Sequence, residues 1–349
     1  MNGIRFVHTD HLRLAESITG LAAAPSWLGR LARDATRGAV SRVFEIAKSR
    51  NADFVFIGGR CTESGEFQSS VGQWLEKPIR NLRQHGIQVV MAASQTVATE
   101  CLADVVLHPG NRLHATRSKG QVRLETRPAD STETSELAVS PELVGQSVNA
   151  ACNYLFRAQI RPAESLSPNG QMVYSAGTTQ SHGPHEQGEF GCLVVDADPD
   201  IGRLDTFFES TDLLRFETRK IEPPSVASSQ MICDAVIEES RILARQQRRT
   251  TVVDWHVETP LECTGELESW WPDTILNSVR SVLQQGHIGV WPRCVQLTPS
   301  NVRFAGGADC AATRVLTSLL FEQPSDSNQG SCTIFAELIT GARLLGRAA

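Results

Sequence analysis

Short apolar runs alternate with segments of helical periodicity over the first hundred residues. The apolar runs are Ile4–Val7, Phe54–Ile57, Val89–Ala92 and Ala103–Leu107. Runs of this length are typical of strands that are covered on both faces. Between them, apolar residues recur at helical spacing, first at Val40, Val43, Phe44 and Ala47 and then at Val71, Leu75, Ile79 and Leu82. This alternation predicts βαβ units around a parallel sheet.

The pattern changes in the second half of the chain. The segment Pro128–Pro141 is rich in Ser, Thr, Glu and Asp and has no apolar period, which predicts an exposed loop. After Gln171, strand-like runs follow one another with turn residues between them. These runs are Met172–Ser175, Gly191–Asp196, Leu204–Glu209 and Leu214–Ile221.

A second strand and helix alternation follows and predicts a small α/β unit. It consists of a helix over Gln230–Arg248, a strand over Thr250–Val257, a helix over Trp271–Gln284 and a strand over Val290–Leu297. We therefore expect a larger domain over residues 1–212, a small α/β domain over 213–300 and a tail over 301–349. In the tail, Ile334, Phe335, Leu338, Ile339, Ala342 and Leu345 can share one helical face. That face predicts a partner-binding segment.

Composition narrows the class of protein. The apolar share of 41% is enough for a globular core, and the formal net charge of −6 argues against a generally basic nucleic-acid binder. No run approaches the roughly 18–20 apolar residues of a membrane helix, and no signal-peptide pattern opens the chain. The nine cysteines form no Cys-x-x-Cys pair, so neither a zinc ribbon nor a redox motif is indicated. Their odd number, without a secretion signal, indicates reduced thiols. We expect a cytoplasmic protein with no membrane partner.

The order of the segments resembles a known family. The first strand ends in His8-Thr9-Asp10-His11-Leu12-Arg13, the second in Ile57-Gly58-Gly59-Arg60, and the third runs into Ser94-Gln95-Thr96-Val97. A later segment reads Tyr154 to Arg161, and Tyr174 to Cys192 follows it. Together these segments resemble the SbcD/YhaO-type DNA repair exonucleases of the calcineurin-like metallophosphoesterase superfamily. The resemblance implies a metallophosphoesterase sandwich with a small α/β capping domain.

The residues at the family's metal-ligand positions differ from the family pattern. The resemblance places His11, Arg13, Arg60, Gln95, Gln159 and Arg161 where the family carries Asp, His and Asn ligands. Such enzymes hold two divalent ions about 3.5–4 Å apart, which generate the hydroxide nucleophile. Arginine cannot be deprotonated to serve as a ligand and repels cations. We therefore expect no Mn or Mg cofactor and no catalytic residue.

Two uses of the altered site follow from its residues. Three arginines from separate segments replace metal ligands in the altered site, and their planar guanidinium groups suit phosphate. We therefore predict a phosphate-binding pocket formed by Arg13, Arg60, Arg161, His11, Gln95 and Gln159. The alternative is that the arginines pair with nearby acids such as Asp10 and Glu63. A metal-dependent phosphodiesterase rebuilt around Asp10, His11 and Glu63 is the competing enzymatic hypothesis.

The resemblance also implies a partner. We expect a pseudoenzyme related to DNA repair, which acts as a scaffold or DNA-binding partner of an SMC-like ATPase of the SbcC/YhaN kind. We expect weak and non-specific DNA binding. The sequence does not decide between a monomer and a homodimer. An interaction module with no link to DNA is the third hypothesis.

Overall fold

The computed structural model describes residues 3–59, 61, 69–92, 105–107, 112–117, 120–128, 135–141, 152–166, 172–198, 201–222, 229–247, 249–259, 271–285 and 289–299. Within these residues the chain is a mixed α/β protein, as the sequence predicts. The helices are α1 (Ser26–Ser49), α2 (Ser69–Gln84), α3 (Ser229–Gln246) and α4 (Trp271–Gln285). The strands form three sheets, two of them six-stranded and one three-stranded. No described helix is long and apolar enough to cross a membrane.

The first sheet contains the strands that the apolar runs predict. Its order is β12-β11-β1-β2-β3-β4, in which β1 to β4 run parallel and β11 and β12 run antiparallel to their neighbours. The strands are β1 (Ile4–Thr9), β2 (Phe54–Ile57), β3 (Gln88–Ala92), β4 (Val105–Leu107), β11 (Gly191–Asp198) and β12 (Arg203–Ser210). The parallel strands therefore end at one edge of the sheet, next to their connecting loops.

The second sheet lies against one face of the first. Its order is β5-β6-β7-β8-β10-β9. The strands are β5 (Arg112–Arg117), β6 (Gly120–Pro128), β7 (Ser135–Pro141), β8 (Cys152–Phe156), β9 (Ala163–Leu166) and β10 (Met172–Ser175). The predicted loop over Pro128–Pro141 is wrong for its second half, because β7 pairs there with both β6 and β8. Cross-strand pairing overrides the polar composition of this segment.

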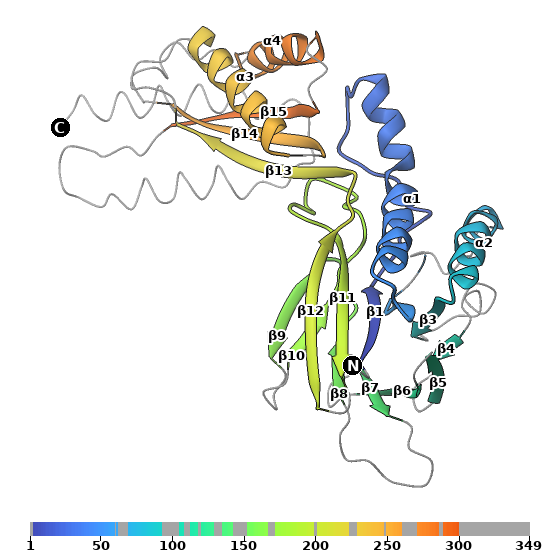
Figure 1. Cartoon of the computed structure of the whole chain (residues 1–349). Helices are drawn as coiled ribbons and strands as arrows, with labels where there is room; N and C mark the ends of the chain where they lie inside the picture. Colours follow the sequence, from blue (N-terminus) through green and yellow to red (C-terminus); the bar gives the residue numbers. More distant parts are fainter. Residues whose placement is uncertain are drawn as a thin grey trace, which may run out of the picture.

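Alternation along the strands divides the core in two. Phe6 and Phe56 point toward the second sheet and pack against Tyr154 and Phe156. On the other face, Val7 and its neighbours pack under the buried sides of α1 and α2, the latter through Leu75, Ile79 and Leu82. Figure 1 shows α1 and α2 beside the first sheet. Loops, not helices, follow β1 and β2 directly at the carboxyl edge of the sheet.

A smaller unit follows Leu213. Its sheet has the order β13-β14-β15, all parallel, with β13 (Leu214–Ile221), β14 (Thr250–Thr259) and β15 (Val290–Pro299). Helices α3 and α4 pack on this sheet (Figure 1). Ile232 of α3 and Val279 of α4 share a buried cluster with Trp255 of β14. These strands and helices match the predicted ones to within a few residues. The tail over 301–349 lies outside the described residues.

Helix α1 and the side chain of Gln180 join the two units. Leu28 and Ala35 of α1 pack against Leu214 of the small sheet. Gln180 is buried, and its Oε1 accepts a hydrogen bond from the Leu213 backbone N–H at 2.8 Å while its Nε2 donates to the Leu214 carbonyl at 2.5 Å. A buried amide with both ends bonded fixes the chain where it passes from one unit to the other.

Candidate functional site

The carboxyl edge of β1 and β2 is where the sequence places the altered site. Thr9 pairs with Ile57 in the parallel ladder, so Asp10 and Gly58 follow their strands side by side. The Gly59 backbone N–H donates to the Asp10 carbonyl at 3.2 Å, which keeps the two loops together. Ligands of open parallel sheets bind at such carboxyl edges.

Asp10 lies at the centre of this edge and has no solvent exposure. Its Oδ2 accepts hydrogen bonds from the Ser175 hydroxyl at 2.9 Å, the Gly177 backbone N–H at 3.0 Å and the Gln159 backbone N–H at 3.2 Å. Its Oδ1 lies 2.9 Å from Nε2 of His8 but makes no hydrogen bond within the described residues. Protein donors therefore meet one oxygen of the Asp10 carboxylate, and His8 lies beside the other.

His8 extends this network into the core. Its Nδ1 lies 2.8 Å from the Tyr154 hydroxyl, and its ring contacts the rings of Phe56 and Phe156. Burial, and after it the negative charge of Asp10, raises the pKa of Tyr154 well above its usual value. Tyr154 therefore stays protonated, and its hydroxyl and the His8 imidazole share one buried hydrogen bond.

The two glycines after β2 leave no room for further groups. A Cβ added at Gly58 would lie 2.8 Å from His8 Nε2 and 3.0 Å from Asp10 Oδ1. A Cβ added at Gly59 would lie 2.5 Å from His11 Nδ1. His11 therefore packs directly against the end of β2, next to position 60, and Arg60 itself lies outside the described residues.

Arg13 is an ion-paired residue in this structure. Its Nε donates to Glu16 at 2.5 Å and its Nη1 donates to Glu186 at 2.6 Å, and the residue is 9% exposed. Burial opposes the cation, but the hydrogen bonds to Glu186 and Glu16 outweigh it and raise the pKa of Arg13. With two carboxylates on one guanidinium, the predicted phosphate ligand is already neutralised. The pairing counts against the predicted phosphate pocket at this position.

Arg161 and Gln159 also differ from the expectation. Arg161 is exposed, and its Nη2 donates to the His185 carbonyl, next to the Glu186 that pairs with Arg13. The structure therefore brings Arg13 and Arg161 to one loop. Gln159 contacts Asp10 through its backbone rather than its side chain. Gln95, like Arg60, lies outside the described residues, so the convergence of all the predicted residues stays a prediction.

The loop that holds Arg13 contains a buried histidine. The His182 backbone N–H donates to the second oxygen of Glu186 at 2.7 Å, and His182 Nε2 lies 3.1 Å from the Thr36 hydroxyl. Burial, and after it the positive charge of Arg13, lowers the pKa of His182 to about 4. His182 is therefore neutral at physiological pH. Among the described residues, no group of His, Cys, Asp and Glu is arranged to hold a metal ion.

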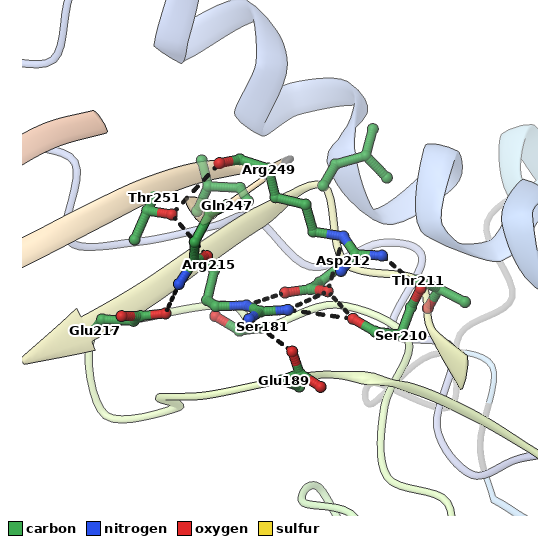
Figure 2. Close-up of polar contacts among 12 residues, drawn as sticks. Ser181, Glu189, Ser210, Thr211, Asp212, Arg215, Glu217, Gln247, Arg249 and Thr251 are labelled. Atoms are coloured by element: carbon green, nitrogen blue, oxygen red, sulfur yellow. Dashed lines mark hydrogen bonds and ion pairs between the residues drawn. The ribbon is translucent and has the colours of Figure 1, made fainter. Parts of the chain in front are cut away.

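A second polar cluster lies where the two units meet, and the sequence interpretation missed it. Asp212 is fully buried, and the guanidinium groups of Arg215 and Arg249 point toward it in Figure 2. Arg249 is half-buried, with 24% of its side chain exposed.

No protein-family model matches this chain, and no curated protein matches it.

Proposed function

We propose that this protein is a non-catalytic relative of the DNA repair exonuclease subunits, which acts as a scaffold or DNA-binding partner of an SMC-like ATPase. The proposal includes the fold: a calcineurin-like metallophosphoesterase sandwich followed by a small α/β capping domain. Two stacked sheets with α1 and α2 on the outer face of the first, followed by a parallel sheet of three strands, support this assignment.

The observation that carries the proposal is the environment of Asp10. A carboxylate that binds a catalytic metal needs a free lone pair directed at the ion. Asp10 instead receives two backbone amides and the Ser175 hydroxyl on one oxygen and faces His8 with the other. These contacts engage Oδ2 in holding the loops together, while Oδ1 lies beside His8 without a hydrogen bond. No further His, Cys, Asp or Glu of the described residues joins Asp10 and His8 in a group that could hold a metal ion.

The ion pairs of Arg13 support the same proposal. Glu16 and Glu186 bind the Arg13 guanidinium rather than a metal ion. Since hydrolysis in this family depends on a metal-bound hydroxide, a site built from these residues supplies no nucleophile at neutral pH. We propose that the ancestral Mn or Mg pair is lost.

The test is a phosphodiesterase assay with Mn²⁺ on bis-nitrophenyl phosphate and on linear duplex DNA. The proposal predicts no turnover above that of a mock purification. His11→Ala is the matched site variant, because the His11 ring packs on Gly59 at the end of β2. Turnover that follows the protein through purification and falls in His11→Ala would instead establish the rebuilt hydrolase around Asp10, His11 and Glu63.

The partner has its own test. Co-expression with a coiled-coil ATPase of the SbcC/YhaN kind should give a complex that survives gel filtration. Separate elution of the two proteins at micromolar concentration would remove the ATPase from the proposal and favour an interaction module with no link to DNA.

A further inference from the structure

A pocket of about 880 Å³ lies at the junction of the two units. Its walls come from the outer face of α1, the end of β12, the start of β13 and the segment between α3 and β14. Its charged lining consists of the guanidinium groups of Arg42, Arg215 and Arg249 and the carboxylates of Glu45, Glu189 and Glu209. A volume of this size is typical of small-molecule sites, which hold ligands through a few convergent polar groups.

Asp212 anchors the arginines from beneath the pocket. Arg215 binds it through both ends, with Nε donating to Oδ2 at 2.8 Å and Nη2 donating to Oδ1 at 3.2 Å. Arg249 approaches the same carboxylate with Nε 3.3 Å from Oδ1, and Ser210 donates its hydroxyl to Oδ1 at 2.6 Å (Figure 2). One buried carboxylate therefore holds two guanidinium groups in place.

Arg42 completes the cluster from α1. Its Nη1 donates to the Thr211 carbonyl at 3.3 Å and to the Asp212 carbonyl at 3.0 Å, so it contacts the junction through backbone oxygens only. The side chain is otherwise exposed at the pocket wall. Arg42 therefore adds a positive charge to the junction without bringing a carboxylate of its own.

The three arginines differ in the donors they leave available. Arg215 uses all three nitrogens on Asp212, Glu189 and Ser210. Arg249 donates Nη2 to the Ser210 carbonyl at 2.6 Å, and no acceptor in the described part of the chain meets its Nη1. Within the same residues, Nε and Nη2 of Arg42 have no acceptor either. Two guanidinium groups thus present unused N–H donors to the pocket.

The charges of the cluster do not balance around Asp212. Burial lowers the pKa of Arg249, and repulsion by Arg215 and Arg42 lowers it further, against the attraction of Asp212. Acids on the rim have partners of their own. Glu189, with 57% of its side chain exposed, pairs with Arg215, and Glu209 pairs with Arg50. Glu45, the third acid of the lining, pairs with Lys48. Arg42 and Arg249 are therefore the lining arginines that form no ion pair with a lining carboxylate in the described part of the chain.

We propose that this pocket binds the phosphate group of a nucleotide or of a nucleic-acid strand. Guanidinium groups bind phosphate oxygens through charge-assisted hydrogen bonds, and two groups held in fixed positions suit one phosphate. The carbonyl end of α3 is nearby and disfavours an anion, but its effect is weak beside charged donors in direct contact. The site differs from the predicted Arg13, Arg60 and Arg161 pocket, and it would stand even if the protein hydrolysed phosphodiesters.

The test measures binding of three probes to the full chain at low salt. The probes are inorganic pyrophosphate, ATP and a fluorescent 12-nucleotide single strand. The variants are Arg42→Ala and Arg249→Ala, with Arg203→Ala as the control, because Arg203 is an exposed arginine at the far end of β12. Loss of one charge-assisted contact should weaken binding roughly tenfold. The Arg203→Ala variant should bind like the wild type.

Each outcome decides the proposal. Loss of pyrophosphate and ATP binding in both pocket variants establishes a site for a free phosphate ligand. Binding of the single strand alone, lost in the same variants, assigns the site to nucleic acid. Absence of binding for all three probes at millimolar concentration overturns the proposal, and so does binding that the variants leave unchanged. Arg42→Ala keeps the test valid if Arg249→Ala unfolds, because Arg42 touches only backbone carbonyls at the junction.

Discussion

Replacing Asp10 with alanine distinguishes a structural carboxylate from a metal ligand. Ligand carboxylates of a catalytic site are gathered for function, and their removal from a metal-free enzyme usually leaves stability unchanged or raises it. Asp10 is different, because three protein donors and His8 converge on it in the core. The Asp10→Ala variant leaves these donors buried without an acceptor.

The expected loss follows from those contacts. A hydrogen bond to a charged group contributes about 1.5–3 kcal/mol, and a buried donor left without an acceptor costs about 1–3 kcal/mol. The contributions do not add, and the alanine variant no longer buries a charge. We therefore expect a loss of roughly 3–5 kcal/mol in the free energy of unfolding. For a unit of this size, that loss lowers the melting temperature by on the order of 10 °C.

The assay is thermal and urea unfolding in EDTA, which removes any contribution of bound metal. The control is Asp205→Ala, because the Asp205 carboxylate is 38% exposed and pairs with an exposed Arg203 at 2.8 Å. Such surface pairs contribute about 0.2–1 kcal/mol. If Asp10→Ala is as stable as the wild type in EDTA, and differs from it only when Mn²⁺ is added, Asp10 is a metal ligand and the reasoning fails.

Two further predictions concern the Glu186 loop and the tail. The pKa of His182 is about 4 in the folded chain and near 6.5 in the unfolded chain. The stability that the neutral, buried His182 contributes is therefore present above pH 6.5 and is lost as the pH falls toward 4. Between pH 7 and 4 the wild type should lose about 3 kcal/mol more stability than His182→Gln, as measured by urea unfolding, and equal losses would contradict this reasoning. Deleting residues 330–349 should leave a folded core that no longer co-purifies with the ATPase, whereas aggregation would assign the segment to the core.

The sequence predicts the strands and helices well where burial decides them. The runs Ile4–Val7 and Phe54–Ile57 are apolar because both faces of β1 and β2 are covered. Ser135–Pro141 is a strand for a different reason, since it lies between β6 and β8 in a sheet. No local pattern reveals pairing partners, so its polar composition predicts a loop.

The site is predictable only in part. The sequence places His11 and Asp10 at the carboxyl edge of β1, where the structure also has them. It does not reveal the partner of Arg13, because Glu186 lies 173 positions away along the chain. The junction pocket was missed for the same reason, since Arg42 and Arg249 meet only when the second unit packs on α1.

Calorimetric titration of Mn²⁺ into the EDTA-treated and dialysed protein measures whether a metal pair binds at the carboxyl edge of β1 and β2. We expect no stoichiometric binding at micromolar concentration, because protein donors bind one oxygen of the Asp10 carboxylate and Arg13 is paired with Glu16 and Glu186. A pair of ions per chain, bound with micromolar affinity and lost in His11→Ala, would show that this edge still holds its metals.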